Sequence, residues 1–271
     1  MEILIPVLML GGLGVIFGIG LAIASKKFSV HMDERLERVH GLLPGTNCGA
    51  CGGAGCFGFA EGLLSGKFSI NSCRVSEYAV KEKIAELLGK KLDKQVKRVA
   101  VLHCHGGRKR VKDKFVYEGI KDCVAADMVM SGPKACVYGC IGFATCVTVC
   151  PFGAIAMNED NLPVINEDKC TACGKCVGIC PKKLFTLVTA NKTYAVRCKS
   201  LDMGNKVMDV CSVGCIACRK CENACPVRAI KVVDNLAVID YNICDNRGEC
   251  FRVCPTNAIA KKENKTWVLN G

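Results

Sequence analysis

Two runs of closely spaced cysteines limit what this chain can fold into more than any other feature of its sequence. The first run, residues 170–181, has the form C-x2-C-x2-C-x3-C-P, and residues 215–226 repeat it. In such a run three thiolates bind one [4Fe–4S] cluster and the fourth crosses to a neighbouring cluster. The repeated spacing predicts iron–sulfur binding, with a zinc-rich interaction scaffold as the alternative from a non-redox class.

Cysteine usage also indicates the compartment. The chain has 271 residues and 23 cysteines, an odd number, and their spacings are those of metal ligands rather than of a small disulfide-linked domain. Iron–sulfur clusters need reduced thiolates, so we expect the cysteine-rich part to be cytoplasmic. Because only 6% of the residues are aromatic, the apolar core should be small, and bound clusters should contribute to folding.

The formal net charge of +12 indicates a negatively charged partner. We find no nucleic-acid-binding motif and no stripe of alternating basic and aromatic residues, so we expect no nucleic-acid partner. The charge suits anionic lipid or the docking of an acidic electron-carrier protein. A solvated lysine-rich face without a partner is the alternative.

The N-terminal segment predicts a membrane anchor. Residues 3–25 form an uncharged apolar run, followed at once by Lys26 and Lys27. About 20 such residues cross a bilayer as a helix, whereas a signal peptide, the competing interpretation, has a basic start and a shorter apolar core. The basic pair predicts one span of the cell (inner) membrane, with the N-terminus outside and the later residues in the cytoplasm. Small residues at four-residue spacing favour packing against another membrane helix, namely Gly14, Gly18 and Ala22.

A different cysteine pattern follows this anchor. Four cysteines have the spacing C-x2-C-x4-C-x16-C, and the glycines among them let backbone amides close over a cluster and bond to its sulfurs. We expect one [4Fe–4S] cluster here, close to the membrane surface, held by Cys48, Cys51, Cys56 and Cys73. Residues 76–98 then show apolar residues at helical spacing among lysines, and residues 99–105 are predicted to form a strand.

Alignment of the sequence with itself reveals an internal repeat. Residues 136–151 align without a gap on residues 211–226, and only one ligand is lost, at Phe143. Each copy is followed by two short apolar segments that are joined by a turn and lead to the next cysteine. This is the two-hairpin plan of a bicluster ferredoxin, present twice. In the final run Arg247 stands where the second cysteine belongs.

Crossing the fourth ligand of each run assigns three sets of thiols. One cluster is predicted at Cys170, Cys173, Cys176 and Cys150, and another at Cys215, Cys218, Cys221 and Cys254. An irregular set contains Cys140, Cys146 and Cys180, with Cys136 as the candidate for the ligand missing at Phe143.

Two further sets are less regular. Three thiolates could hold a [3Fe–4S] cluster, or a [4Fe–4S] cluster with a non-thiolate fourth ligand, at Cys225, Cys244 and Cys250. Four cysteines remain that form a sixth cluster or are unligated structural thiols, namely Cys104, Cys123, Cys198 and Cys211. Cys211 is the repeat partner of Cys136, so their roles could be more alike than this division allows. The chain is therefore expected to carry four to six clusters.

These patterns predict an α+β fold with an N-terminal transmembrane helix, a small four-iron domain and two bicluster ferredoxin-like modules. The expected ranges are 1–27 for the anchor, 28–98 for the four-iron domain with its connector, 99–198 for the first module with its preceding strand, and 199–271 for the second module. The sequence has no glycine-rich dinucleotide turn and no Walker loop. No flavin or NAD site is therefore expected on this chain.

Almost from end to end the chain resembles the B subunit of the Rnf complex, the ion-translocating ferredoxin:NAD oxidoreductase. The resemblance rests on the N-terminal helix, NCGACGGAGC at 47–56, DCVAA at 122–126, CVYGCIGFATCVTVCPFGAI at 136–155 and the later ferredoxin motifs. It implies a subunit that accepts electrons from reduced ferredoxin and relays them through clusters to membrane subunits. A flavin-bearing subunit then reduces NAD, and Na+ or H+ is exported. The alternative is a membrane-anchored polyferredoxin that serves another reductase or a hydrogenase without ion pumping.

Overall fold

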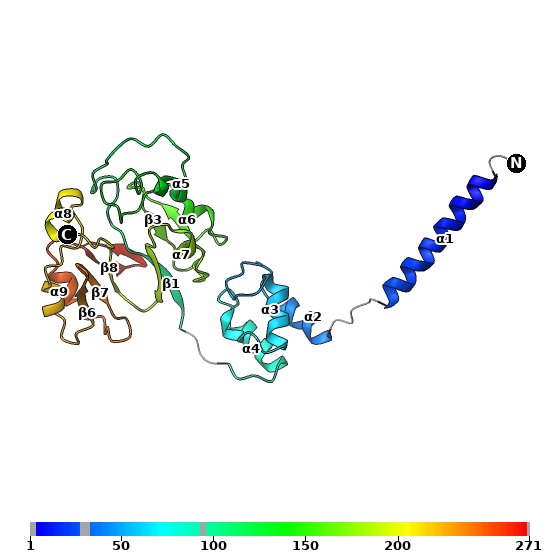
Figure 1. The fold of residues 1–271 in the computed structure, drawn as a ribbon. Helices are drawn as coiled ribbons and strands as arrows, with labels where there is room; N and C mark the ends of the chain where they lie inside the picture. The colour runs from blue at the N-terminus through cyan, green and yellow to red at the C-terminus, as the bar shows by residue number, and fades with distance from the viewer. Residues whose placement is uncertain (1–3, 28–32, 93–95, 270–271) are drawn as a thin grey trace.

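The N-terminal helix stands as one uninterrupted element in the computed structural model, which describes residues 4–27, 33–92 and 96–269 (Figure 1). This helix, α1 (Leu4–Lys27), carries no acidic residue in its first turn and ends on two lysines. Among the described residues it is the one helix long and apolar enough to cross a membrane. From Val7 onward nearly all of its side chains are exposed, as expected of a helix whose apolar surface faces lipid rather than a protein core.

Residues 33–92 form a small helical domain. Its elements are α2 (Glu34–Leu42), α3 (Gly55–Leu64), a 3-10 turn η1 (Ile70–Ser72) and α4 (Tyr78–Leu87). The Asp33 side chain caps α2 by accepting a hydrogen bond from the Arg35 N–H at 2.9 Å, which satisfies one of the free amides of the first turn. Each long helix contributes to the buried core, for example through Val39, Phe59 and Ile84.

Residues 96–269 contain two modules of the same plan, which confirms the predicted ferredoxin-like repeat. In the first module β2 (Ile155–Met157) pairs antiparallel with β3 (Pro163–Ile165), and in the second β6 (Ile230–Val233) pairs with β7 (Leu236–Ile239). Short helices begin inside the cysteine runs, and they are α6 (Thr145–Thr148), α7 (Lys175–Ile179), α9 (Lys220–Asn223) and α10 (Glu249–Arg252).

Each module also has a strand from outside its cysteine repeat. β1 (Arg98–Leu102), which corresponds to the strand predicted at 99–105, pairs with β4 (Phe185–Thr189). β5 (Tyr194–Val196) pairs with β8 (Ile259–Glu263), and β8 also pairs with β9 (Thr266–Val268). β5 lies before residue 199, where the second module is predicted to begin, and its hydrogen bonds join it to β8 of that module.

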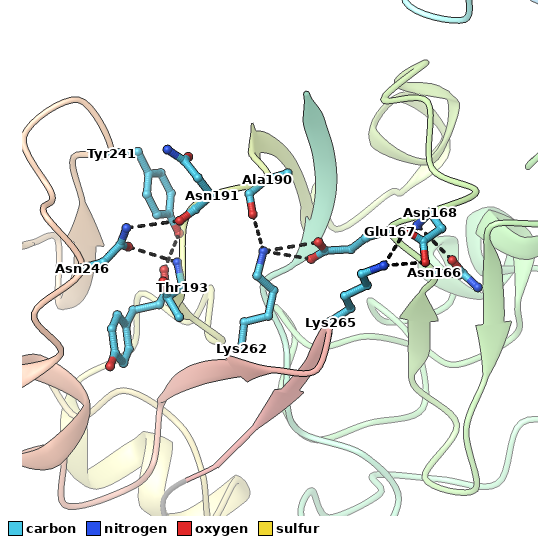
Figure 2. A network of polar contacts seen from close by, with 11 residues as sticks. Asn166, Glu167, Asp168, Ala190, Asn191, Thr193, Tyr241, Asn246, Lys262 and Lys265 are labelled. Carbon is cyan, nitrogen blue, oxygen red and sulfur yellow. Dashed lines mark hydrogen bonds and ion pairs between the residues drawn. The ribbon is translucent and has the colours of Figure 1, made fainter. Parts of the chain in front are cut away.

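Paired charges fasten the β8–β9 hairpin of the second module to the first module (Figure 2). The Lys262 Nζ lies 3.2 Å from a Glu167 carboxylate oxygen, with 12% and 9% of the two side chains exposed, and it donates to the Ala190 carbonyl at 2.5 Å. The next residue, Asp168, pairs with Lys265 at 2.7 Å on the surface. These contacts hold the two modules together. Their acidic residues, Glu167 and Asp168, directly precede the cysteine run that begins at Cys170.

Candidate iron–sulfur sites

The 23 cysteines are all free thiols, and they gather into six groups. Among the described residues no three His, Cys, Asp or Glu side chains lie close enough together to hold a single metal ion. Four of the cysteine groups instead line small cavities. Thiols spread around a cavity suit a multi-iron cluster, because each iron atom then takes its own thiolate.

The helical domain holds the group that we name site 1, which brings together the four cysteines expected there. The Asn47 side chain accepts a hydrogen bond from the Cys56 N–H at 2.7 Å, which fixes the loop around the cavity. Gly55 has φ +81°, and a Cβ at this position would lie 2.8 Å from the Asn47 side-chain oxygen, so the loop requires glycine here. The cavity is lined by Cys48, Cys51, Cys56 and Cys73.

Three groups in the modules combine the residues that the crossed-ligand rule predicts. Site 3 is the group around Cys176, whose pKa is raised by burial and by the nearby thiols of Cys170, Cys173 and Cys150. Site 4 is a cavity lined by Cys215, Cys218, Cys221 and Cys254. Site 5 has the three thiols Cys225, Cys244 and Cys250. Arg247, at the missing fourth position of site 5, has a side chain that is 58% exposed and pairs with Asp245 at 2.6 Å.

Site 2 differs from the expectation. Its cavity is lined by Cys140, Cys146 and Cys180 as predicted, but the fourth thiol is Cys123 and not Cys136. The Cys136 carbonyl accepts a hydrogen bond from the Gly139 N–H at 3.1 Å, and this turn precedes Cys140. The thiol of Cys136 lies in a different cavity, so Cys123 occupies the place that the missing ligand at Phe143 leaves open.

A compact polar network places Cys123 at the start of α5 (Cys123–Met128). The Asp122 carboxylate caps this helix by accepting from the Val124 and Ala125 N–H groups at 2.8 and 2.9 Å, and it accepts from the Thr145 hydroxyl at 2.8 Å. The Thr145 oxygen in turn accepts from the Cys123 N–H at 2.8 Å. These hydrogen bonds lower the pKa of Asp122. Because Thr145 begins α6, the network ties Cys123 directly to the helix that carries Cys146.

The sixth group lies between the two modules, and we name it the interface site. Its cavity is lined by two thiols from each module, Cys104 and Cys136 from the first and Cys198 and Cys211 from the second. Cys104 follows β1, Cys198 follows β5, and Cys211 follows α8 (Gly204–Val210). Three of the four cysteines that remained after the crossed-ligand assignment are therefore together, with Cys136 in place of Cys123.

The interface site repeats its hydrogen bonds on the two sides. The Cys140 N–H donates to the Cys104 sulfur at 3.4 Å, and the Cys215 N–H lies close enough to the Cys198 sulfur to lower the pKa of that thiol. Cys140 and Cys215 are repeat partners, so this pair of contacts places Cys104 and Cys198 in equivalent positions. The sulfurs of the other two cysteines each accept from the N–H two residues further on, and the interface site is therefore a pseudo-twofold arrangement.

The order of the sites follows from thiols of neighbouring sites that lie close enough together for one to raise the pKa of the other. Site 3 neighbours site 2, site 2 neighbours the interface site, the interface site neighbours site 4, and site 4 neighbours site 5. The thiol pairs that show this are, in the same order, Cys176 with Cys146, Cys140 with Cys104, Cys198 with Cys215, and Cys221 with Cys250. The five sites form one continuous series through both modules.

The thiols are chemically suited to a cationic iron core. Burial raises the pKa of Cys146 and of Cys136 to about 11, and that of Cys198 to about 12. For Cys140 the pKa is raised further, by burial and then by the neighbouring Cys104. Such thiols ionise near neutral pH only when a metal compensates the negative charge, so cluster binding should release protons.

Comparison with known proteins supports the same division of the chain. The family described as "Putative Fe-S cluster" matches residues 43–75, which include site 1. Two families described as "4Fe-4S dicluster domain" match residues 135–185 and 214–258. The chain therefore carries multiple iron–sulfur clusters.

Three relatives match over most of their length. The B subunit of the Na(+)-translocating ferredoxin:NAD(+) oxidoreductase complex of Acetobacterium woodii is 43% identical over 96% of this chain and 78% of the relative. The B subunit of the ion-translocating oxidoreductase complex of Methanosarcina acetivorans is 41% identical over 92% of this chain and 95% of the relative. The chain belongs to this family of B subunits. Another member, the B subunit of the proton-translocating ferredoxin:NAD(+) oxidoreductase complex of Clostridium ljungdahlii, is 42% identical over 91% of this chain and 88% of the relative.

Membership of the family confirms the resemblance drawn from the cysteine motifs. It also agrees with an α1 that could anchor the chain in a membrane, and with a role within a multi-subunit oxidoreductase. Sequence spacing grouped Cys123 with the possible sixth cluster, whereas the structure places it beside Cys140, Cys146 and Cys180. The only sequence signal for this was indirect, in that Cys136 and Cys211 are repeat partners and so should share a site.

Proposed function

We propose that this chain is the electron-relay subunit of a membrane-bound, ion-translocating ferredoxin:NAD+ oxidoreductase. The observation that carries the proposal is the continuous series of thiol-lined sites, from site 3 through the interface site to site 5, on a chain that also has an apolar membrane-length helix. The Acetobacterium woodii relative is named as Na+-translocating and the Clostridium ljungdahlii relative as proton-translocating, so either coupling ion fits the family.

Six clusters are assigned by this proposal. Five have four thiolate ligands each and hold [4Fe–4S] clusters, whereas site 5 has three thiolates and holds either a [3Fe–4S] cluster or a [4Fe–4S] cluster with a non-thiolate ligand. The groups are those described above, with Cys123 at site 2 and Cys136 at the interface site. All 23 cysteines then act as ligands, because five sets of four and one of three account for the cysteine content.

The residues of this chain position the clusters and tune their charge. A bound cluster supplies a centre that gains or loses one electron, so each transfer oxidises one site and reduces its neighbour without making or breaking a bond. N–H groups that donate to ligand sulfurs favour the reduced, more negative form. Examples are the Leu184 N–H to Cys180 at 3.5 Å and the Ala229 N–H to Cys225 at 3.3 Å. Buried apolar residues such as Leu102 and Ile155 pack among the thiols of the first module and exclude water from the path.

The electron donor and acceptor lie on other proteins in this proposal. The net charge of +12 suits an acidic ferredoxin as donor, because opposite charges steer encounter and orient docking. The sequence has no dinucleotide-binding glycine turn, so NAD+ reduction belongs to a flavin-bearing subunit, and electrons pass to it through other membrane subunits. Lys26 and Lys27 at the end of α1 favour an N-terminus outside the cell membrane and cluster domains in the cytoplasm.

The proposal is tested in membranes from a strain that lacks this chain. Ferredoxin-dependent NAD+ reduction should disappear, and the wild-type chain should restore it. A Cys136→Ser chain should restore little activity, because the series is interrupted at its centre. A Met208→Ala chain is the matched control, since Met208 is 59% exposed on α8 beside the same site. Unchanged NAD+ reduction without the chain would contradict the proposal, and loss of hydrogen-dependent reduction instead would favour a polyferredoxin that serves a hydrogenase.

A further inference from the structure

A buried arginine faces the interface site. Arg197 directly precedes the ligand Cys198, is 6% exposed, and lines the same cavity as the four thiols. Its Nη2 donates to the Cys104 carbonyl at 3.4 Å, and its guanidinium carbon lies 5.8 Å from the centre of the Trp267 ring. Among the described residues, its Nε and Nη1 have no hydrogen-bond partner.

Such a side chain is unusual because a buried charge normally has a partner of opposite sign. The guanidinium of an arginine keeps its positive charge in proteins. The described residues provide no ion pair to a carboxylate for it among the pairs within 4.0 Å. The negative partner that the location offers is the thiolate set of the interface site, and the N–H groups of two guanidinium nitrogens, Nε and Nη1, remain for it.

The pseudo-twofold repeat supplies an internal comparison. His103 precedes Cys104 as Arg197 precedes Cys198. The His103 N–H donates to the Leu184 carbonyl and the Arg197 N–H to the Ala258 carbonyl, both at 2.7 Å. The backbone positions are therefore equivalent, and only the side chains differ.

Both ring nitrogens of His103 are hydrogen-bonded, in contrast to the guanidinium of Arg197. The His103 Nδ1 donates to the Val196 carbonyl and its Nε2 pairs with the Thr186 hydroxyl, both at 2.6 Å. The fold thus accepts a side chain at this position whose polar atoms all have partners within the protein, and the unpartnered nitrogens of Arg197 belong to the second module alone.

We propose that Arg197 raises the reduction potential of the cluster at the interface site, so that an electron crossing between the two modules is stabilised there. The inference rests on the proposed relay function. A fixed positive charge beside a negative cluster favours the form that carries one more electron. The electron comes from a neighbouring site, which is oxidised as the interface site is reduced. Arg197 is therefore a tuning residue that acts on the cluster without being one of its ligands.

The test is a redox titration of the purified full-length chain in detergent, followed by electron paramagnetic resonance. Arg197→His is the first variant, because it copies His103 into the equivalent position. One cluster signal should shift to a lower potential, with at least a tenfold smaller ratio of reduced to oxidised cluster at a fixed solution potential. For a one-electron couple a tenfold change corresponds to about 59 mV. Arg197→Lys keeps the charge and should shift the signal less.

A control variant separates this effect from a general change in charge. Arg252→Gln removes the same charge from a side chain that is 66% exposed on α10, and it should leave every potential unchanged.

Two results would overturn the inference. The first is an Arg197→His chain with full iron content and wild-type potentials. The second is loss of four iron atoms in both Arg197→His and Arg197→Gln while Arg197→Lys stays loaded, which would make Arg197 a structural support. Because the titration uses the isolated chain, its outcome does not depend on whether ferredoxin and NAD+ are the physiological partners.

Discussion

Glu167→Gln removes the negative charge from the buried ion pair that joins the two modules. Its partner Lys262 remains 12% exposed at the side chain and keeps its contact to the Ala190 carbonyl at 2.5 Å and its position over the Trp267 ring at 5.8 Å. Asp168→Asn is a matched control, because Asp168 is the next residue and pairs with a lysine of the same hairpin. In that pair the side chains of Lys265 and Asp168 are 62% and 65% exposed.

The expected magnitudes differ because the two pairs differ in burial. Removing one partner of a buried ion pair costs about 3–5 kcal/mol, since the remaining charge stays in a poorly solvated place. Lys262 keeps two other contacts, and glutamine still offers an amide oxygen, so we expect about 3 kcal/mol for Glu167→Gln, the lower end of this range. An exposed pair contributes little because water screens both charges, and Asp168→Asn should change stability very little.

Unfolding rates in urea provide the assay, because cluster loss makes unfolding irreversible. Trp267, the only tryptophan of the chain, lies beside Lys262 and reports the hairpin by its fluorescence under anaerobic conditions. A change of about 1.4 kcal/mol in the barrier is a factor of ten in rate. If the pair is largely broken in the transition state, Glu167→Gln should unfold roughly ten to one hundred times faster than wild type.

The double variant Glu167→Gln with Lys262→Met completes the comparison. The double variant should unfold more slowly than Glu167→Gln alone, because no unpaired charge then stays buried. Equal unfolding rates for Glu167→Gln and Asp168→Asn would refute the reasoning, since burial would then not distinguish the two pairs. A double variant that unfolds faster than Glu167→Gln alone would also contradict it.

Three other predictions concern the sites and the donor. Cys136→Ala should remove the interface cluster and leave the site 2 cluster bound. Cys123→Ala should weaken binding of the site 2 cluster and leave the interface cluster bound. The iron content and the Mössbauer spectra of both variants check this. Oxidised protein should show a [3Fe–4S] paramagnetic signal from site 5, and Arg247→Cys should convert it to a [4Fe–4S] signal; a wild-type chain without this signal, with a fourth ligand found at the cluster, would contradict a three-iron site. Raising salt should increase the Michaelis constant for ferredoxin, because a basic docking surface is screened, and a constant value from low to high salt would argue against such a surface.

The fold was largely predictable because the cysteine spacing and the hairpin segments repeat in register. Each run places its helix, its turn and its next strand at fixed distances from the ligands, and the structure contains β2–β3 and β6–β7 where the apolar segments predict them. The α+β class, the membrane-length helix and the separate site 1 domain follow from patterns that each lie within one continuous segment of the chain. Such local patterns do not depend on how distant segments pack.

The sequence assigned Cys123 and Cys136 to each other's sites, and their true places were not predictable in the same way. Both cysteines stand outside the regular runs, so their partners depend on where α5 and the turn after Cys136 lie. The hydrogen bonds from Asp122 and Thr145 that bring Cys123 to site 2 join segments more than twenty residues apart. Spacing alone contains no information on that contact.

The module boundary and the role of Arg197 have a similar explanation. β1 and β5 lie outside the cysteine repeat, and each pairs with a strand far away in the sequence, β4 and β8 respectively. Only this pairing reveals that the residues before Cys104 and Cys198 occupy equivalent positions. A histidine with both ring nitrogens hydrogen-bonded on one side then corresponds to an arginine with two unpartnered nitrogens on the other.

The proposed series of clusters is tested most directly by the position of iron in the loaded chain, measured by anomalous X-ray scattering or by high-resolution electron cryo-microscopy. Iron should form a continuous series of five clusters through residues 96–269, with the central one held by Cys104, Cys136, Cys198 and Cys211, two ligands from each module. Iron bound by Cys136 together with Cys140, Cys146 and Cys180, and none between the modules, would contradict it.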